Sequence, residues 1–293
     1  MSPLKQLVVL SGKGGTGKTT VTAALAHLAS QERALVLADA DVDAANLELV
    51  LDPVQQEVHD FWSGRLAIVD PEACTACGRC AEVCRFEAVV VGDVYRVDPL
   101  ACEGCAACSY QCPVEAITMH EQHAGRWFRS GTHFGPLFHA HLFAGRENSG
   151  KLVTTVKQQA SVYALDASAA LLLVDGPPGI GCPVISASVG ADLALLVVEP
   201  TVSGAHDLER VLATTEHFGV PAVAAINKAD LNLARSDQIA AYCSERGIEV
   251  VGRIPYDTVV TEAMVAGQPV TAVEDGAVSR ALREVWEGCK RHI

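Results

Sequence analysis

Nine consecutive residues near the start of the chain have the types and spacing of a phosphate-binding loop. The stretch GKGGTGKTT follows an apolar run and precedes a helical pattern. It satisfies G-x-x-x-x-G-K-[ST], in which backbone N–H groups of the loop surround phosphates and the next helix adds its positive end. Lys18 is expected to reach the β- and γ-phosphates, and the Thr19 hydroxyl to ligate Mg²⁺. The predicted nucleotide ligands in this loop are Gly12, Lys13, Gly14, Gly15, Thr16, Gly17, Lys18, Thr19 and Thr20.

A second lysine, Lys13, stands at the beginning of this loop. The form GKGG[TV]GKT resembles the MinD/ParA family of deviant P-loop ATPases. The resemblance implies a homodimer with ATP at its interface, in which Lys13 reaches the partner's nucleotide and acts in catalysis together with Lys18. The alternative is a solvated loop lysine without such a role.

Three carboxylates follow a short apolar run, residues 34–38, that is typical of a buried parallel strand. They are Asp39, Asp41 and Asp43, and the end of such a strand faces the crevice in which α/β folds bind ligands. The family resemblance identifies this strand end as switch I and implies that Asp41 orients the attacking water. Asp39 or Asp43 is then expected to assist Mg²⁺ or the coupling of the switch. A plain acidic turn is the alternative.

A second apolar run, residues 171–174, ends at Asp175 in the sequence DGPPG. This is the Walker B arrangement, and D-x-P-P-G resembles switch II of the same family. The resemblance implies that Asp175 holds Mg²⁺ through a water molecule and that Gly179 lets the loop move with the γ-phosphate.

Two later strand ends are expected to hold the base. Asn227 opens the sequence NKAD, and Pro255 follows residues 250–254. In GTP-binding proteins the NKxD motif binds guanine through its aspartate, here Asp230. In the MinD/ParA family the asparagine at this position contacts adenine. ATP is therefore the predicted nucleotide, with GTP as the alternative.

Cysteine is concentrated in one part of the chain, where eight of the eleven cysteines lie between Cys74 and Cys112. They form two C-x2-C-x2-C-x3-C motifs, 28 residues apart, and the similarity continues past the cysteines as an internal duplication. The spacing resembles the bacterial ferredoxin with two [4Fe–4S] clusters, in which the fourth cysteine of each motif crosses to the other cluster. The resemblance implies one cluster held by Cys74, Cys77, Cys80 and Cys112 and a second held by Cys102, Cys105, Cys108 and Cys84.

One position departs from the ferredoxin pattern, which has proline after the fourth cysteine. Pro113 obeys it, whereas Arg85 stands at the other site. Arg85 is expected to pair with the negative charge of the cluster or with a carboxylate of a partner, and so to raise the potential of the cluster ligated by Cys84. Two four-cysteine zinc sites are the alternative.

The composition disfavours some classes of function. The chain has 293 residues and a formal charge of −13, which disfavours nonspecific binding to nucleic acid. No run reaches the roughly 18 apolar residues of a membrane span, and the apolar stretch at the start is too short for a signal peptide. The amphipathic tail, 282–293, is expected to pack inside the protein instead of on a membrane. A cytoplasmic location is predicted, and cysteines there favour metal ligation over disulfides.

These observations predict an α/β fold, a doubly wound and mostly parallel P-loop NTPase sheet with a small inserted α+β ferredoxin-like domain. The expected ranges are 1–70 and 153–293 for the ATPase domain, 71–119 for the ferredoxin insert and 120–152 for a histidine-rich connecting segment.

Half of the ten histidines lie in that connecting segment. His139 and His141 would share one face if they belong to a strand. A polar surface between the two modules is the expected role of these histidines, and a transition-metal or proton-relay site is the alternative.

The predicted function is an ATP-hydrolysing iron–sulfur protein. Its MgATP-switched homodimer would gate electron transfer through two [4Fe–4S] clusters to an unidentified redox or iron–sulfur partner protein. An iron–sulfur cluster carrier similar to the Mrp-type ATPases is the first alternative, and a positional ATPase of cell division is the second. Cobyrinate amidation is disfavoured because the chain lacks the length for a glutaminase region.

Overall fold

The computed structural model describes residues 3–145 and 149–293 and divides the chain into two compact units. Residues 146–148, which belong to the expected connecting segment, lie outside this description. The first unit contains Met1–His59, Trp127–His141 and Ser149–Ile293, and the second contains Asp60–Arg126 and Leu142–Asn148.

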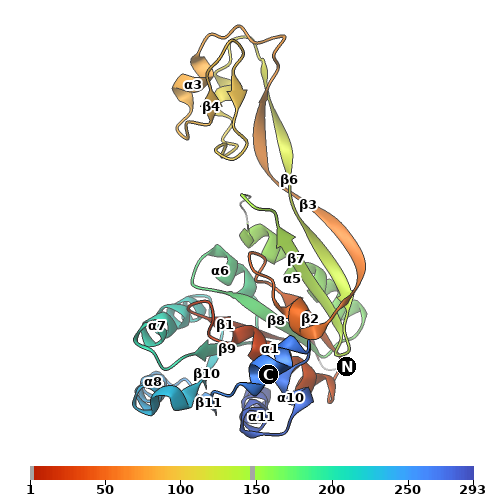
Figure 1. Ribbon diagram of the computed structural model, residues 1–293, viewed down its shortest axis with the longest axis vertical. Helices are drawn as coiled ribbons and strands as arrows, with labels where there is room; N and C mark the ends of the chain where they lie inside the picture. The colour runs from red at the N-terminus through yellow and green to blue at the C-terminus, as the bar shows by residue number, and fades with distance from the viewer. Residues whose placement is uncertain (1–2, 146–148) are drawn as a thin grey trace. The chain divides into compact units, whose positions relative to one another are not determined.

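The first unit is organised around a sheet whose strand order is β11-β10-β9-β1-β8-β2-β7-β6-β3 (Figure 1). All pairings from β11 through β7 are parallel. The central strands are apolar along almost their whole length, as strands covered on both faces must be. The prediction of a mostly parallel α/β sheet is confirmed. The parallel strands other than β7 are β1 (Lys5–Ser11), β2 (Leu35–Asp39), β8 (Leu171–Pro178), β9 (Leu193–Val198), β10 (Ala222–Asn227) and β11 (Val250–Ile254).

Helices of the first unit pack in two groups. α1 contacts α2, α10 and α11, and α5 contacts α6. In the last helix Val285, Trp286 and Cys289 are buried, so the tail packs inside the unit as predicted. No helix among the described residues is both long and apolar enough to span a bilayer. The helices are α1 (Lys18–Ser30), α2 (Leu47–Leu51), α5 (Ser149–Asp166), α6 (Cys182–Ser188), α7 (Val202–His217), η1 (Ala229–Asn232), α8 (Leu233–Glu245), α9 (Val259–Val265), α10 (Val270–Val273) and α11 (Ala277–Lys290).

The histidine-rich segment forms strands of this sheet. β6 (Ile117–Gly131) turns into β7 (Pro136–Leu142), and β3 (Val54–Val69) lies on the other side of β6. The described residues of the range 120–152 therefore fall mostly in β6, β7 and α5, and they do not form a separate connecting segment. Within β3, Gly64 adopts a φ of +76° that a residue with a side chain rarely takes.

The second unit is small and built from short elements. Its core contains Ala67, Cys80 and Ile117, with further cysteines packed against them. β4 and β5 pair antiparallel. The elements are α3 (Arg79–Val83), β4 (Val89–Val90), β5 (Arg96–Val97) and α4 (Ala107–Tyr110), together with parts of β3 and β6.

Candidate functional site

The glycines of the loop between β1 and α1 serve two different purposes. Cβ atoms at Gly14 and Gly15 would meet open space, so their backbone is free to approach a ligand. A Cβ at Gly12 would fall 2.3 Å from the Cβ of Asp207, and one at Gly17 would fall 2.2 Å from the side-chain amide nitrogen of Asn227. The first pair therefore suits phosphate, whereas the second pair is required by packing within the protein.

A cavity of about 1000 Å³ lies over this loop. Its volume is at the upper end of that of small-molecule sites. Thr16 has a buried hydroxyl for which the described residues offer no hydrogen-bond partner, as expected of a group that meets a ligand. Of the predicted nucleotide residues, the lining includes Gly14, Gly15, Thr16, Gly17, Lys18, Thr19, Thr20, Asp41, Asn227 and Pro255 but not Gly12, Lys13, Asp39, Asp175 or Gly179.

Asp175 lies under the cavity, where it organises the start of α1. The Thr19 hydroxyl donates to its Oδ2 at 2.7 Å, and the Thr22 hydroxyl donates to its Oδ1 at 2.8 Å. Lys18 Nζ lies 3.3 Å from Asp175 Oδ1 and 3.7 Å from Asp41 Oδ2. Sequence reasoning missed Thr22. The signal was a hydroxyl one turn after the motif on a helix that is otherwise buried and apolar.

Excess negative charge gathers around Lys18. Burial by itself would lower the pKa of Lys18, but the charges of Asp175, Asp41 and Asp39 outweigh burial and raise it. Burial and the neighbouring Asp175 raise the pKa of Asp39 to about 8. Burial also raises the pKa of Asp41, although Lys18 opposes this effect. Asp175 and Asp41 beside the Lys18 ammonium group, with the Thr19 hydroxyl, form an oxygen donor set that fits Mg²⁺.

Asp39 connects β2 to α2. Its Oδ1 accepts a hydrogen bond from Asp41 N, and its Oδ2 accepts one from Leu47 N, each at 3.0 Å. Asp43 also lines the cavity. The three aspartates expected in switch I therefore differ in position. Asp41 and Asp43 line the cavity, whereas Asp39 is fully buried and holds the local backbone.

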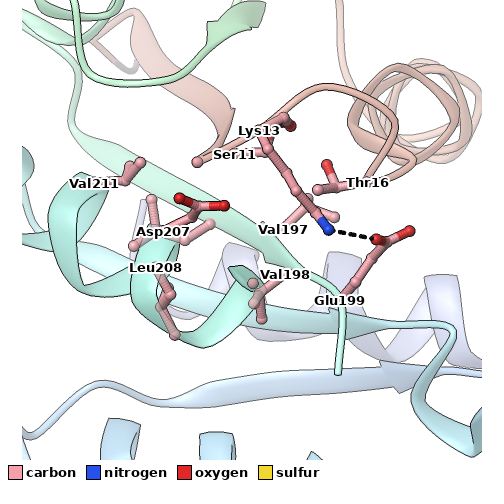
Figure 2. A pocket seen from close by; sticks show the side chains of 12 residues that line it. Ser11, Lys13, Thr16, Val197, Val198, Glu199, Asp207, Leu208 and Val211 are labelled. Carbon is pink, nitrogen blue, oxygen red and sulfur yellow. Dashed lines mark hydrogen bonds and ion pairs between the residues drawn. The ribbon is translucent and has the colours of Figure 1, made fainter. Parts of the chain in front are cut away.

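Lys13 does not line the large cavity, and its side chain points toward Glu199 at the end of β9 (Figure 2). Its Nζ lies 3.3 Å from Glu199 Oε2 and also contacts the hydroxyls of Thr201 and Ser203. Lys228 contacts the other carboxylate oxygen at 2.6 Å. Burial alone would raise the pKa of Glu199, but hydrogen bonds from Lys228 and Lys13 outweigh it and lower the pKa. Sequence reasoning assigned no role to Glu199, which holds Lys13 within its own chain.

The expected base-binding residues Asn227 and Pro255 both line the cavity. Asn227 donates its side-chain N–H to the Thr16 carbonyl at 2.7 Å, so it also fixes the loop. Asp230 accepts a hydrogen bond from Tyr256 N at 2.7 Å and thereby holds the turn after Pro255. Gly179, at a φ of +93°, donates its backbone N–H to the Ser11 carbonyl at 2.9 Å, which ties the end of β8 to the start of the loop.

The eight cysteines of the second unit form two separate sets of four. One cavity is lined by the first three cysteines of the first motif and the last of the second motif. The other is lined by the first three of the second motif and the last of the first. Pro113 lines the first cavity, and Arg85 is exposed and lines neither. The two sets are Cys74, Cys77, Cys80 and Cys112, and Cys84, Cys102, Cys105 and Cys108.

The two motifs also share their backbone conformation. Ala88 N donates to Cys84 Sγ at 3.3 Å, and 28 residues later Ala116 N donates to Cys112 Sγ at 3.2 Å. The residues that precede and follow the second cysteine of each motif have positive φ, two of them alanines. Such left-handed turns aim N–H groups inward and are costly without a purpose. Thiol ligands with inward N–H donors fit an anionic iron–sulfur cluster. The four left-handed residues are Ala76, Gly78, Gly104 and Ala106.

Comparison with protein families places these motifs in context. The sequence profile described as "CbiA: CobQ/CobB/MinD/ParA nucleotide binding domain" matches residues 7–270. A protein of Methanocaldococcus jannaschii, "Uncharacterized protein MJ0578", is 33% identical over 290 residues, which cover 99% of this chain and 98% of that protein. An "Iron-sulfur cluster carrier protein" of Pyrococcus horikoshii is 23% identical over 299 residues, which cover 96% of this chain and 84% of that protein.

Among solved structures, the septum site-determining protein MinD complexed with Mg-ADP from Pyrococcus horikoshii is similar with a TM-score of 0.63. The alignment covers 99% of this chain and 97% of that chain at 18% sequence identity. At this identity the likeness shows a shared fold.

Proposed function

This chain belongs to the CobQ/CobB/MinD/ParA nucleotide binding domain family and is a P-loop ATPase of the MinD/ParA type. We propose that it couples MgATP hydrolysis in a homodimer to electron transfer through two [4Fe–4S] clusters. The observation that carries this proposal is the crossed arrangement of the cysteines, because two cavities with four thiols each suit two four-cysteine clusters.

In the nucleotide site, each group near Lys18 has a defined task. Lys18 would neutralise phosphate charge, and Thr19 and Asp175 would hold the Mg²⁺ ion that accompanies the nucleotide. Asp41 faces the cavity from the end of β2 and would accept a hydrogen bond from the attacking water. Bound MgATP supplies the scissile phosphoanhydride, while these side chains orient it and stabilise charge.

Dimer formation would change the contacts of Lys13. In the single chain its ammonium group is held by Glu199 and two hydroxyls. A role on the partner's nucleotide requires Lys13 to leave Glu199 for a more highly charged phosphate. The Lys13 ammonium group would have an anionic partner before and after this exchange, so the free-energy cost of desolvating it again is small. Lys228 would remain to neutralise Glu199.

The cysteines that would hold the clusters lie in the second unit. Bound clusters supply one-electron transfer, and the protein sets their potential through N–H···S hydrogen bonds and burial. Cys84 and Cys112 each accept such a bond, whereas Cys77 and Cys105 are exposed. A redox partner would exchange electrons with the clusters at the surface near Cys77 and Cys105. That partner and a cytoplasmic location remain predictions.

A second candidate is an iron–sulfur cluster carrier. It is favoured by the similarity over nearly the whole chain to the carrier protein of Pyrococcus horikoshii. The closed sets of four cysteines argue against it, since a transferable cluster needs an open or shared ligand position.

Anaerobic purification followed by EPR-monitored redox titration tests the proposal. Wild-type protein should show two [4Fe–4S] signals whose potential or spin coupling shifts when MgATP is added, and Lys18→Ala should show the same signals without the shift. Signals indifferent to MgATP, together with transfer of iron to an apo-ferredoxin, would favour the carrier. Absence of iron after anaerobic reconstitution would refute both candidates.

A further inference from the structure

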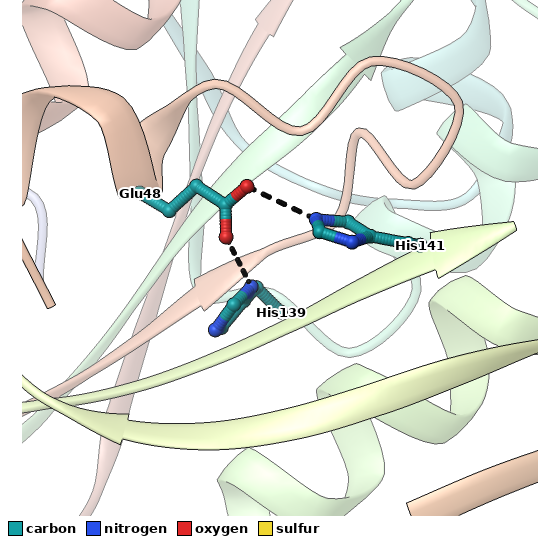
Figure 3. A group of neighbouring side chains, drawn as sticks. All are labelled: Glu48, His139 and His141. Atoms are coloured by element: carbon teal, nitrogen blue, oxygen red, sulfur yellow. Dashed lines mark hydrogen bonds and ion pairs between the residues drawn. The ribbon is translucent and has the colours of Figure 1, made fainter. Parts of the chain in front are cut away.

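Three side chains of the first unit converge at a place that the proposed function does not use. Glu48 projects from α2, and His139 and His141 project from the same face of β7 (Figure 3). Their potential ligand atoms all lie within 4.8 Å of one another. Glu48 Oε2 is 2.9 Å from His139 Nδ1, and Glu48 Oε1 is 3.0 Å from His141 Nε2.

His139 is the most constrained of the three. Its side chain is 5% exposed, and its Nε2 lies 3.0 Å from the Ser130 hydroxyl. A neutral imidazole carries a lone pair on one of its two ring nitrogens. Its Nδ1 is buried, yet no atom among the described residues forms an aligned hydrogen bond with it, although the Glu48 carboxylate is close.

The position of the proton on His139 decides what the Nδ1 atom can do. If Nε2–H donates to Ser130, the Nδ1 lone pair faces a carboxylate oxygen, which is repulsive unless a cation lies between them. A hydrogen bond from the remote ring nitrogen to a neighbouring oxygen is also the usual support of a metal-bound histidine. The unaligned, buried Nδ1 is therefore available to bind a cation.

We propose that Glu48, His139 and His141 bind a divalent first-row transition-metal ion such as Zn²⁺. Two imidazoles and one carboxylate are a donor set used by zinc enzymes, and imidazole disfavours Mg²⁺ and Ca²⁺. Ligand atoms around tetrahedral zinc are about 3.4 Å apart, and the two contacts that Glu48 makes with the histidines, 2.9 and 3.0 Å, are close to that spacing. His141 is exposed, which leaves the fourth position open to water.

This ion would be distinct from the Mg²⁺ of the nucleotide and from the cysteine sites. It would fasten α2 to β7, two elements that are far apart in the sequence. α2 begins with Leu47, whose backbone N–H holds Asp39, and two of its residues, Leu49 and Val50, line the large cavity. The ion would therefore brace the segment between the end of β2 and the nucleotide.

The test is a Co²⁺ titration of the full chain, purified anaerobically with its clusters. Co²⁺ bound to nitrogen and oxygen ligands gives visible d–d bands, whereas thiolate-bound Co²⁺ adds strong near-ultraviolet charge transfer, so the cysteine sites are distinguishable. The variants are His141→Ala and Glu48→Gln. The matched control is His133→Ala, which removes another exposed histidine that precedes the same strand.

Wild type and His133→Ala should bind one Co²⁺ with d–d bands and no thiolate charge transfer, and Zn²⁺ should displace it. His141→Ala and Glu48→Gln should bind it at least about 100-fold more weakly, since each protein ligand carries roughly a quarter of the binding energy of a four-ligand site. Since His141 is exposed, its loss should leave the thermal midpoint of the metal-free protein unchanged. The proposal is overturned if the bands are equal in all variants, or if wild type binds Co²⁺ only through thiolates.

Discussion

The crossed arrangement of the cysteines makes a prediction that iron counting can decide. Cys77 and Cys105 occupy equivalent positions of the two motifs, 28 residues apart, and both are exposed. Cys112 lines the cavity of Cys77, although it lies only seven residues from Cys105. The double variants Cys77→Ala/Cys112→Ala and Cys105→Ala/Cys112→Ala are therefore matched in chemistry and exposure and differ only in which cavities they damage.

The expected magnitudes follow from four irons per cluster. Wild type should contain about eight irons per chain, and each single variant about four. The first double variant damages one cavity and should retain about four irons, whereas the second damages both and should retain close to none. Iron and acid-labile sulfide, measured after anaerobic reconstitution, give these numbers directly.

The opposite pattern would refute the reasoning. If each motif closed its own cluster, the pair Cys105 and Cys112 would belong together and its double variant would retain about four irons. Equal iron loss in both double variants would instead mean that the two sites do not assemble independently. Zinc in place of iron in anaerobically expressed protein would favour the zinc alternative.

Three further predictions concern the first unit. Lys18→Ala should weaken MgATP binding at least about 100-fold in calorimetry, because a charge-assisted contact with the phosphates is lost; binding within tenfold of wild type would contradict its role. Gly17→Ala should lower the free energy of unfolding by about 1–3 kcal/mol in urea, because φ is +85° and its Cβ would clash, whereas Gly14→Ala, which faces open space and has no positive φ, should change it far less. Lys157 donates to the carbonyls of Ala187 and Val189 at the end of α6, and Lys157→Met should cost about 2–4 kcal/mol because both acceptors lose their charged donor. Burial lowers the pKa of Lys157 from 10.5 to about 8. Between these pH values the folded state binds fewer protons than the unfolded state, so wild type should gain stability relative to Lys157→Met as pH rises through that window, and a parallel pH profile would contradict this.

The sequence predicted those parts of the site whose residues are contiguous. The phosphate-binding loop and the aspartates at the ends of β2 and β8 follow from local patterns, because strand ends in a parallel sheet meet at one edge. The sequence did not predict how the glycines divide their tasks. Gly12 and Gly17 are required by Asp207 and Asn227, and contacts across some two hundred residues leave no local pattern.

The same limit applies to the charged partners. His139 and His141 were recognisable from their spacing, but Glu48 lies 93 residues before His141 on a helix of five residues. Nothing in the sequence near Glu48 distinguishes it from other surface glutamates. Glu199 likewise follows a buried strand. Its ion pairs with Lys13 and Lys228, which follow other strands, form only in the folded sheet.

The small core of the second unit bears on the choice between electron transfer and cluster delivery. Its buried apolar residues include Ala67, Cys80 and Ile117, and three of the partly buried side chains that pack against them are cysteines. A core of this size supplies little stability, and small domains of this kind depend on metals for their folding energy. Because each set of four takes cysteines from both motifs, each bound cluster would join the two halves of the unit. A protein that delivers clusters would have to unfold this unit at each delivery, whereas a protein that transfers electrons keeps its clusters and its fold.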